Sequence, residues 1–307
     1  MNVVPLNFLL SIMKRTKLYI IAFIAVAAAM FMTSCGRVSH HEQRVVSVTI
    51  LPQKFLAEQI AGEHFVVNCV VPANSNPEAY DPTPMQLVEI GESEAYLRVG
   101  GMLGFEMVWM DRLAQNNPDM KIYDTSSGID VIKVTHSHTH GNGVVHSYDG
   151  ADPHIWSSPR NLRIMAHNIY VALMELDAAH ASDYRSNYER LVQHIDSVDS
   201  VVTDLLEPYR GTAFAIYHPS LSYLARDYGL TQLCLENMGK ENSALTMKNT
   251  VDEAMQSGVR VVFVQREFNP RQVETFAREL DAEVVTINPL NYNCTTEIID
   301  IAHAIAR

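Results

Sequence analysis

Cysteine is scarce in this chain, which has four cysteines among 307 residues. Beyond Cys35 only Cys69, Cys234 and Cys294 remain, and their spacing matches none of the Cys-rich zinc motifs. A zinc module built on cysteine pairs is therefore excluded. One disulfide would suit an oxidising compartment, but we expect buried free thiols, because unpaired cysteine is among the most buried residue types.

Basic residues are also few. Lysine and arginine number 23 against 35 aspartates and glutamates, which gives a net charge of −12 at pH 7. This charge argues against nucleic acid as a partner and raises the local concentration of cations. The contents of 47% hydrophobic and 19% charged residues are those of a globular protein. The chain is long enough for two lobes of ordinary domain size.

The one long apolar run, residues 18–32, is shorter than the about 20 residues that a membrane-spanning helix needs. Basic residues precede it and the small residues before Cys35 follow it, which is the layout of a secretory signal peptide. Its end resembles a bacterial lipoprotein box. We therefore expect residues 1–34 to be removed, Cys35 to be lipidated, and residues 35–44 to tether the protein in the periplasm or cell envelope. An uncleaved membrane helix is the alternative.

From residue 45 onwards, strand-like and helix-like segments alternate. Runs rich in β-branched residues predict buried strands, and apolar residues at helical spacing predict helices. The expected strands are 45–50, 65–71, 95–99, 121–124, 213–217, 231–235, 259–264 and 283–287. The expected helices are 54–60, 85–92, 105–115, one opening at Ser158-Pro159, 220–228, 246–256, 270–280 and 295–306. Such repeated units predict mainly parallel sheets flanked by helices, an α/β fold.

Residues 181–209 differ from the rest because they contain no glycine and no proline before Pro208, with apolar residues at helical spacing. They predict one amphipathic helix about 43 Å long, which is longer than the interior of one lobe requires. We therefore expect two lobes, residues 45–180 and 210–307, joined by this single linking helix. A long surface helix within one domain is the alternative.

Histidines concentrate in the tract 134–147 and just beyond it. A Gly-rich, His-rich composition cannot pack a core, and imidazole is the commonest side-chain ligand of transition metals. We interpret the tract as a mobile metal-gathering loop, too floppy for a tight site, with an inert solvated loop as the alternative. The rigid segment Asp152-Pro153-His154-Ile155-Trp156 follows, and His154 is a candidate fixed ligand. The histidines of the tract are His136, His138, His140 and His146.

Further candidate ligands follow the ends of other expected strands, where open α/β sheets bind their ligands. Each has an ordinary alternative: a core histidine, an exposed acid or a turn former. Most of the loops contain a proline, which reduces the entropy lost when a ligand is positioned. These candidates are Glu78, His218, Glu267 and Asn288.

From about residue 45 to its end, the chain resembles the metal-specific solute-binding proteins of bacterial ABC importers that take up zinc or manganese. The resemblance implies two lobes joined by one long helix, a membrane permease as partner, and His154 and His218 as ligands. A His-rich loop just before the Asp-Pro-His motif is typical of the zinc branch. The segments that carry the resemblance are 76–84, 152–159, 217–230, 239–244 and 288–290.

Two positions depart from the family pattern. The first histidine of the family falls on Glu78, and the aspartate of the carboxyl-terminal lobe falls on Asn288. Glu78 is then expected as an oxygen ligand, and the fourth position stays open to Asn288, Glu267, water or a histidine of the tract. Zn²⁺ accepts this mixture of nitrogen and oxygen ligands, and so do Mn²⁺ and Fe²⁺.

The expected function is the high-affinity capture of a divalent transition metal, Zn²⁺ before others, outside the cytoplasm and its delivery to an ABC permease. A secreted metal-dependent hydrolase is the first rival, because two histidines and one carboxylate can activate a metal-bound water. The chain has neither a His-Glu-x-x-His helix nor a Gly-x-Ser-x-Gly turn, so we expect no enzyme. The second rival is a surface lipoprotein that stores metal or acts as an adhesin.

Overall fold

The computed structural model describes residues 44–139, 145–237, 240–241 and 244–307. The expected signal peptide, Cys35, the tether before residue 44 and His140 lie outside these residues. Residues 44–307 form one compact unit. Within the described part of the chain, no helix has the length and apolar character needed to cross a bilayer.

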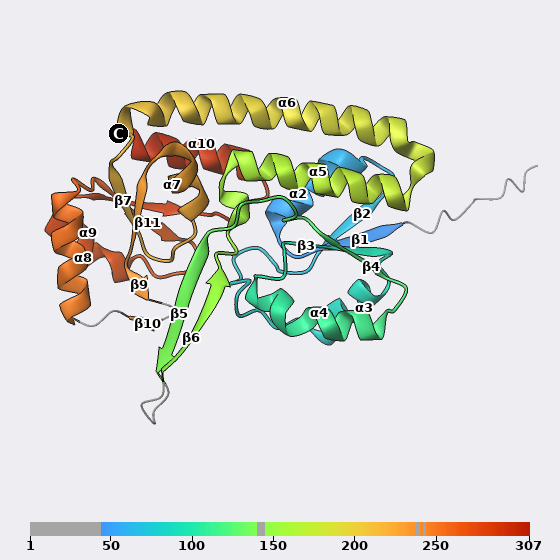
Figure 1. The fold of residues 1–307 in the computed structure, drawn as a ribbon, viewed down its shortest axis with the longest axis horizontal. Coiled ribbons are helices and arrows are strands. Elements are labelled where there is room, and N and C mark those ends of the chain that lie inside the picture. Colours follow the sequence, from blue (N-terminus) through green and yellow to red (C-terminus); the bar gives the residue numbers. More distant parts are fainter. Residues whose placement is uncertain (1–43, 140–144, 238–239, 242–243) are drawn as a thin grey trace, which may run out of the picture. The chain divides into compact units, whose positions relative to one another are not determined.

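Two four-stranded parallel sheets form the framework, which confirms the predicted α/β architecture (Figure 1). The first sheet has the order β2-β1-β3-β4 and the second β12-β11-β7-β8. In both, the earliest strand lies between the second and third along the chain, so each sheet has a switch point at which ligands bind in open α/β folds. The strands are β1 (Val45–Val48), β2 (Val66–Cys69), β3 (Ala95–Arg98), β4 (Lys121–Asp124), β7 (Ala213–Ile216), β8 (Thr231–Cys234), β11 (Val261–Gln265) and β12 (Glu283–Ile287).

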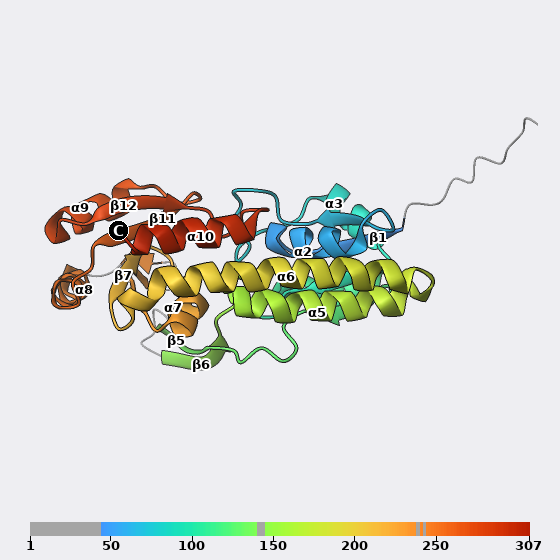
Figure 2. The same cartoon turned by 90° about the horizontal axis from the view of Figure 1, so that it is seen from above.

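Helices cover both sheets, and one of them joins the two halves. We call the first sheet with its helices α2 to α5 the first lobe, and the second sheet with α7 to α10 the second lobe. The helix α6 runs along both lobes and packs against α2 and α5 of the first and α10 of the second (Figures 1 and 2). The helices are α2 (Leu51–Ala61), α3 (Pro84–Gly91), α4 (Gly104–Asn116), α5 (Pro159–Leu176), α6 (Ala181–Leu206), α7 (Ser222–Tyr228), α8 (Ala244–Gln256), α9 (Arg271–Leu280) and α10 (Cys294–Ile305).

The linking helix was predicted over residues 181–209, and the structure gives α6 followed by a 3-10 turn at Glu207–Tyr209. Pro208 explains the difference, because proline cannot supply the backbone N–H that an α-helix requires. The buried face of α6 belongs to one hydrophobic core that reaches from Val46 in β1 to Phe263 in β11. Each fully buried Leu, Ile or Val contributes about 1.5–3 kcal/mol. The shared core therefore holds the two lobes against a common support.

The prediction of an irregular loop over 134–147 is wrong for its described part. Residues Lys133–Thr139 form β5 and Val145–Ala151 form β6, an antiparallel ribbon in which His138 pairs with His146. The β-branched residues in these strands favour an extended backbone, and the ladder satisfies backbone groups that a loop would leave to water. The sequence prediction weighed glycine and histidine content and overlooked this. In Figure 1 the ribbon extends away from the two sheets.

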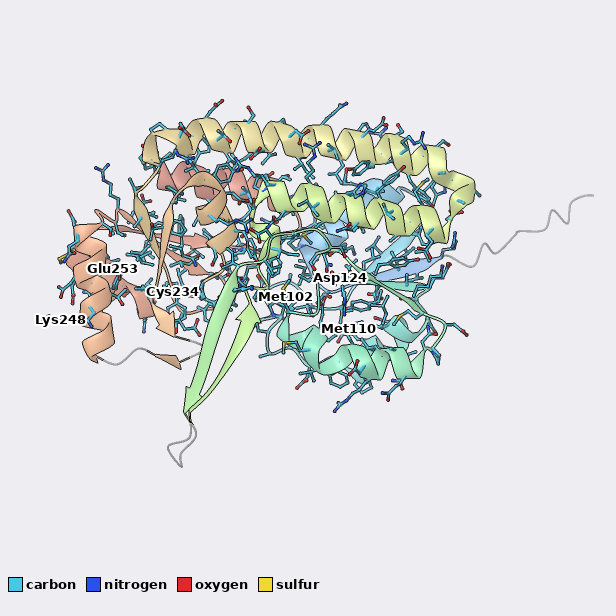
Figure 3. The ribbon with its side chains drawn as sticks, in the orientation of Figure 1. Met102, Met110, Asp124, Cys234, Lys248 and Glu253 are labelled. Carbon is cyan, nitrogen blue, oxygen red and sulfur yellow. The ribbon has the colours of Figure 1, made fainter. Side chains whose placement is uncertain are left out.

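The three described cysteines, Cys69, Cys234 and Cys294, are free thiols. Cys234 ends β8 in the second lobe (Figure 3), and its Sγ donates to the carbonyl oxygens of Tyr217 and Glu236 at 3.1 and 3.0 Å. Burial raises the pKa of the Cys234 thiol to about 12. This thiol therefore packs as a small neutral side chain rather than as a thiolate ligand.

A buried carboxylate on α4 ties that helix to the first sheet. Glu106 is 2% exposed and accepts hydrogen bonds from the backbone N–H groups of Val99 at 2.6 Å and Gly101 at 2.8 Å, and from the Thr49 hydroxyl. Met110, one turn further along α4, is also buried (Figure 3). Since buried N–H groups need partners, Glu106 secures the turn after β3.

Replacing Glu106 by alanine should therefore lower the free energy of unfolding by about 2–4 kcal/mol, because each buried donor left without a partner costs about 1–3 kcal/mol. Urea denaturation followed by circular dichroism measures this change. Glu89→Ala, an exposed position on neighbouring α3, should change stability by no more than about 0.5 kcal/mol. Equal effects of the two substitutions would contradict the structural role of Glu106.

Candidate metal centre

Loops from both lobes bring Glu78, His154 and His218 together. Glu78 lies between β2 and α3, His154 follows β6, and His218 follows β7. Glu78 Oε1 is 3.6 Å from His154 Nε2 and 3.4 Å from His218 Nε2, and the two Nε2 atoms are 3.3 Å apart. Among the described residues, this is the one group of three or more His, Cys, Asp or Glu side chains whose ligand atoms lie within 4.8 Å of one another.

The backbone around Glu78 is held from two sides. The Asn76 side chain accepts a hydrogen bond from Glu78 N at 2.9 Å, and Phe105 N donates to the Pro77 carbonyl at 3.1 Å. Gly104 begins α4 directly against this loop, where a Cβ atom would lie 2.0 Å from the Glu78 carbonyl oxygen. Glycine at this position therefore allows the amino end of α4 to approach and support the loop.

His154 is oriented by its neighbour in sequence. One oxygen of the Asp152 carboxylate accepts hydrogen bonds from His154 N at 2.9 Å and from His154 Nδ1 at 2.8 Å. His154 is 6% exposed, and the ring centroid of Trp156 lies 5.2 Å away. Since a carboxylate only accepts, the ring proton resides on Nδ1 and the lone pair on Nε2 points into the cluster.

His218 has the same arrangement with a different carboxylate. Its Nδ1 donates to Glu236 Oε2 at 2.9 Å, and its carbonyl accepts from Gln265 Nε2 at 2.5 Å. Histidines that bind metals usually donate their other ring N–H to a carboxylate or carbonyl, which sets the tautomer and makes the ligand nitrogen more basic. Both histidines of the cluster show this pattern.

The pKa values of Glu78 and His218 shift in opposite directions. Burial acts to raise the pKa of Glu78, but the hydrogen bond from His218 and the charges of His154 and His218 outweigh it and lower the pKa. Burial acts to lower the pKa of His218, yet the hydrogen bonds and charges of Glu236 and Glu78 raise it to about 10. Without metal, the Glu78 carboxylate and the His218 imidazolium therefore form an ion pair within the cluster.

The two remaining candidates of the second lobe differ in position. Glu267 lines the same small cavity as the cluster, and burial raises the pKa of its carboxyl. Asn288 is not among the described residues that line this cavity, and its backbone N–H donates to Glu297 at 2.6 Å. The structure thus brings Glu267, and not Asn288, to the wall around the cluster.

The other sequence candidates lie on the ribbon. His136 and His138 belong to β5 and His146 to β6, which ends one residue before Asp152. The sequence could have indicated the orienting role of Asp152, because Asp152 lies two residues before His154 in the Asp-Pro-His segment. Glu236 carried no such signal, since it lies 18 residues beyond His218 and reaches it only through the fold.

Comparisons with known proteins find relatives that are named as metal-binding proteins. The family model described as zinc-uptake complex component A, periplasmic (ZnuA), matches residues 46–298. A crystal structure of ZnuA is 32% identical with a TM-score of 0.75, and the match covers 86% of this chain and 98% of that one. A putative metal-binding protein of Chlamydia muridarum is 27% identical over 267 residues, 86% of this chain and 91% of the relative. The iron-binding protein YfeA of Yersinia pestis is 25% identical over 244 residues, 78% and 74% of the two chains.

In the metal-free protein we expect His218 to be an imidazolium at pH 8, because its pKa of about 10 lies above that pH. NMR of histidine-labelled protein measures this state. Glu236→Gln removes a negative charge that favours the imidazolium, so it should lower the pKa of His218. Glu253→Gln, an exposed change on α8, should leave it unchanged. Titration of His218 near the unperturbed value of about 6.5 in the unaltered protein would contradict the charge balance described above.

Proposed function

Since the chain belongs to the ZnuA family of periplasmic zinc-uptake components, we propose that it captures Zn²⁺ with high affinity and delivers it to the permease of an ABC importer. The family binds divalent metal outside the cytoplasm and works with such a permease. The chain is accordingly a metal-binding solute-binding protein and not an enzyme.

The observation that carries the choice of zinc is the spacing of Glu78, His154 and His218. Their ligand atoms are 3.3, 3.4 and 3.6 Å apart. Tetrahedral Zn²⁺ with bonds of about 2.0–2.1 Å requires neighbouring ligands about 3.3–3.4 Å apart. The spacing therefore favours a tetrahedral ion such as Zn²⁺.

The charge balance of the cluster supports the same proposal. A Zn²⁺ ion takes the place of the His218 Nε2 proton, and both Nε2 lone pairs then point at the metal. Histidine must be neutral to bind a metal, so binding releases this proton. Glu78 is ionised before the metal arrives and needs no proton loss.

We propose Glu267 as the fourth ligand. It lines the cavity next to the cluster, and partial burial raises the pKa of its carboxyl although the charges of His218 and His154 act to lower it. Two imidazoles and two carboxylates are also acceptable to Fe²⁺ and Mn²⁺, and one relative is named for iron. The tetrahedral spacing is what favours zinc over these ions.

Other parts of the chain are proposed to serve capture. We expect residues 1–34 to direct export, Cys35 to carry a lipid anchor and the net charge of −12 to gather cations. The histidines of the β5–β6 ribbon, His136, His138 and His146, are proposed to collect metal before it reaches the cluster. The two lobes, residues 45–180 and 210–307, would each supply two of the four ligands.

His154→Ala should lower the affinity for Zn²⁺ by at least about 100-fold, because loss of a residue that merely orients a ligand already costs about 10–100-fold. Isothermal titration calorimetry with Zn²⁺ and Mn²⁺ measures this, and the unaltered protein should bind one Zn²⁺ more tightly than Mn²⁺. His167→Ala, an exposed histidine on α5, is the control and should bind like the unaltered protein. Unchanged zinc affinity in His154→Ala would refute the site.

Glu267→Gln should weaken Zn²⁺ binding about 10-fold or more, because a neutral amide is a poorer ligand than a carboxylate. Asn288→Ala is its matched control and should have no such effect, since the contact of Asn288 uses its backbone N–H. Competition with a fluorescent zinc chelator measures both affinities. The reverse order of effects would assign the fourth position to Asn288.

A further inference from the structure

The helix α7 of the second lobe contacts the base of the β5–β6 ribbon, the point next to Ile132 and Asp152 where its two strands meet the body of the protein. The Tyr223 hydroxyl donates to the Asp152 carbonyl at 2.6 Å and accepts from Ile132 N at 3.2 Å. The same two residues close the ribbon, because Asp152 N donates to the Ile132 carbonyl at 2.9 Å. One hydroxyl therefore joins both strands at the point where they leave the body of the protein.

Two further residues of α7, Ser222 and Arg226, also contact the base of the ribbon. Arg226 donates through Nη1 to the Asp130 carbonyl at 2.5 Å, and its guanidinium lies 5.0 Å from the centre of the Tyr223 ring. The Ser222 side chain lies close enough to the Asp152 carboxylate to help lower its pKa. The Tyr223 side chain is fully buried. Tyr223 and Arg226 of one helix thus hold the backbone on both sides of the ribbon.

These contacts end at the residue that orients His154. The Asp152 carbonyl is held by Tyr223, and the Asp152 carboxylate is bound to His154 Nδ1. A shift of the Asp152 backbone would move this carboxylate and turn the imidazole away from Glu78 and His218. Ligand geometry has to be held within about 0.5 Å for tight binding.

We propose that Tyr223 is a positioning residue for metal binding. It holds Asp152 so that His154 Nδ1–H stays hydrogen-bonded to the Asp152 carboxylate and His154 Nε2 faces the metal. The proposal rests on the proposed ligation of Zn²⁺ by His154. It makes a residue of the second lobe responsible for the orientation of a ligand of the first. It also makes the base of the ribbon, at Ile132 and Asp152, part of the same rigid unit as the cluster.

The experiment compares Tyr223→Phe with Tyr228→Phe. Tyr228 lies on the same helix, is 3% exposed, and donates its hydroxyl to Asp199 of α6 at 2.6 Å, away from the ribbon. Each substitution removes one hydroxyl, which makes two hydrogen bonds at Tyr223 and one at Tyr228, so both should lower the thermal stability. Only Tyr223→Phe should weaken Zn²⁺ affinity, by about 10–100-fold, as measured by competition with a chelator.

A spectroscopic readout separates positioning from general loosening. In long-range imidazole NMR spectra of the metal-free proteins, the His154 ring should show a single Nδ1–H tautomer in Tyr228→Phe. In Tyr223→Phe it should show a mixture of tautomers. If Tyr223→Phe fails to fold, Ser222→Ala removes a different contact to Asp152 and should lower the affinity several-fold.

The outcomes are distinguishable. If Tyr223→Phe, or Ser222→Ala in its place, binds zinc like the unaltered protein, the positioning role is overturned while the proposed function stands. An equal loss of affinity in both tyrosine variants also overturns it, since the effect would then follow stability alone. If the unaltered protein binds no zinc tightly, or His154→Ala binds like it, the proposed function itself has failed.

Discussion

Two imidazoles that face each other through their Nε2 atoms at 3.3 Å set the requirement that the rest of this structure meets. Asp152 and Glu236 hold the Nδ1 protons, so both Nε2 atoms present lone pairs to the same point. Two lone pairs at this distance repel unless a positive centre lies between them. In the metal-free protein the proton of His218, whose pKa is raised to about 10, is that centre. A divalent cation meets the same need with a larger charge.

Such an arrangement requires the lobes to be held together closely. The core along α6 provides the common support, and direct contacts between the lobes add to it. Trp156 Nε1 donates to the Pro289 carbonyl at 2.9 Å, and the Tyr292 hydroxyl donates to Glu58 of α2 at 2.6 Å. Both contacts use the loop after β12, so this loop joins the two lobes near the cluster. The metal ligands therefore approach a common point because the lobes are already docked.

The fold was largely predictable because its signals are local. The spacing of apolar residues predicts α6, and β-branched runs predict the strands, since both patterns depend on a few neighbouring positions. The proximity of Glu78, His154 and His218 also followed from the rule that parallel strands present their carboxyl ends to ligands. That these three bind metal remains a prediction. The β-branched residues Val134, Thr135 and Thr139 favour an extended backbone, but the sequence interpretation gave more weight to composition and missed the ribbon.

What the sequence could not provide are the contacts that hold the ligands in place. Tyr223 lies 71 residues from Asp152, and Asp152 lies on a different lobe, so no local pattern links them. Glu236 reaches His218 from the short strand β9 (Glu236–Asn237), and nothing in its neighbours marks it. Asn288 was a candidate only by its place in the family pattern, and the fold directs its backbone to Glu297 instead. Partners of this kind depend on packing between distant segments.

The ion pair of Glu78 and His218 has a consequence for how tightly metal can be held. It keeps the ligands assembled before metal arrives, which lowers the ordering cost of binding. It also requires the metal to displace a proton from a group whose pKa is about 10, and at pH 7 this costs about 4 kcal/mol. Such a site therefore binds metal less tightly than its ligands alone would allow, but its geometry is closed and formed before binding. The opposite charge balance, with His218 neutral, would leave two lone pairs and a carboxylate repelling one another across the cluster. Proton and metal are thus alternative cations for one site.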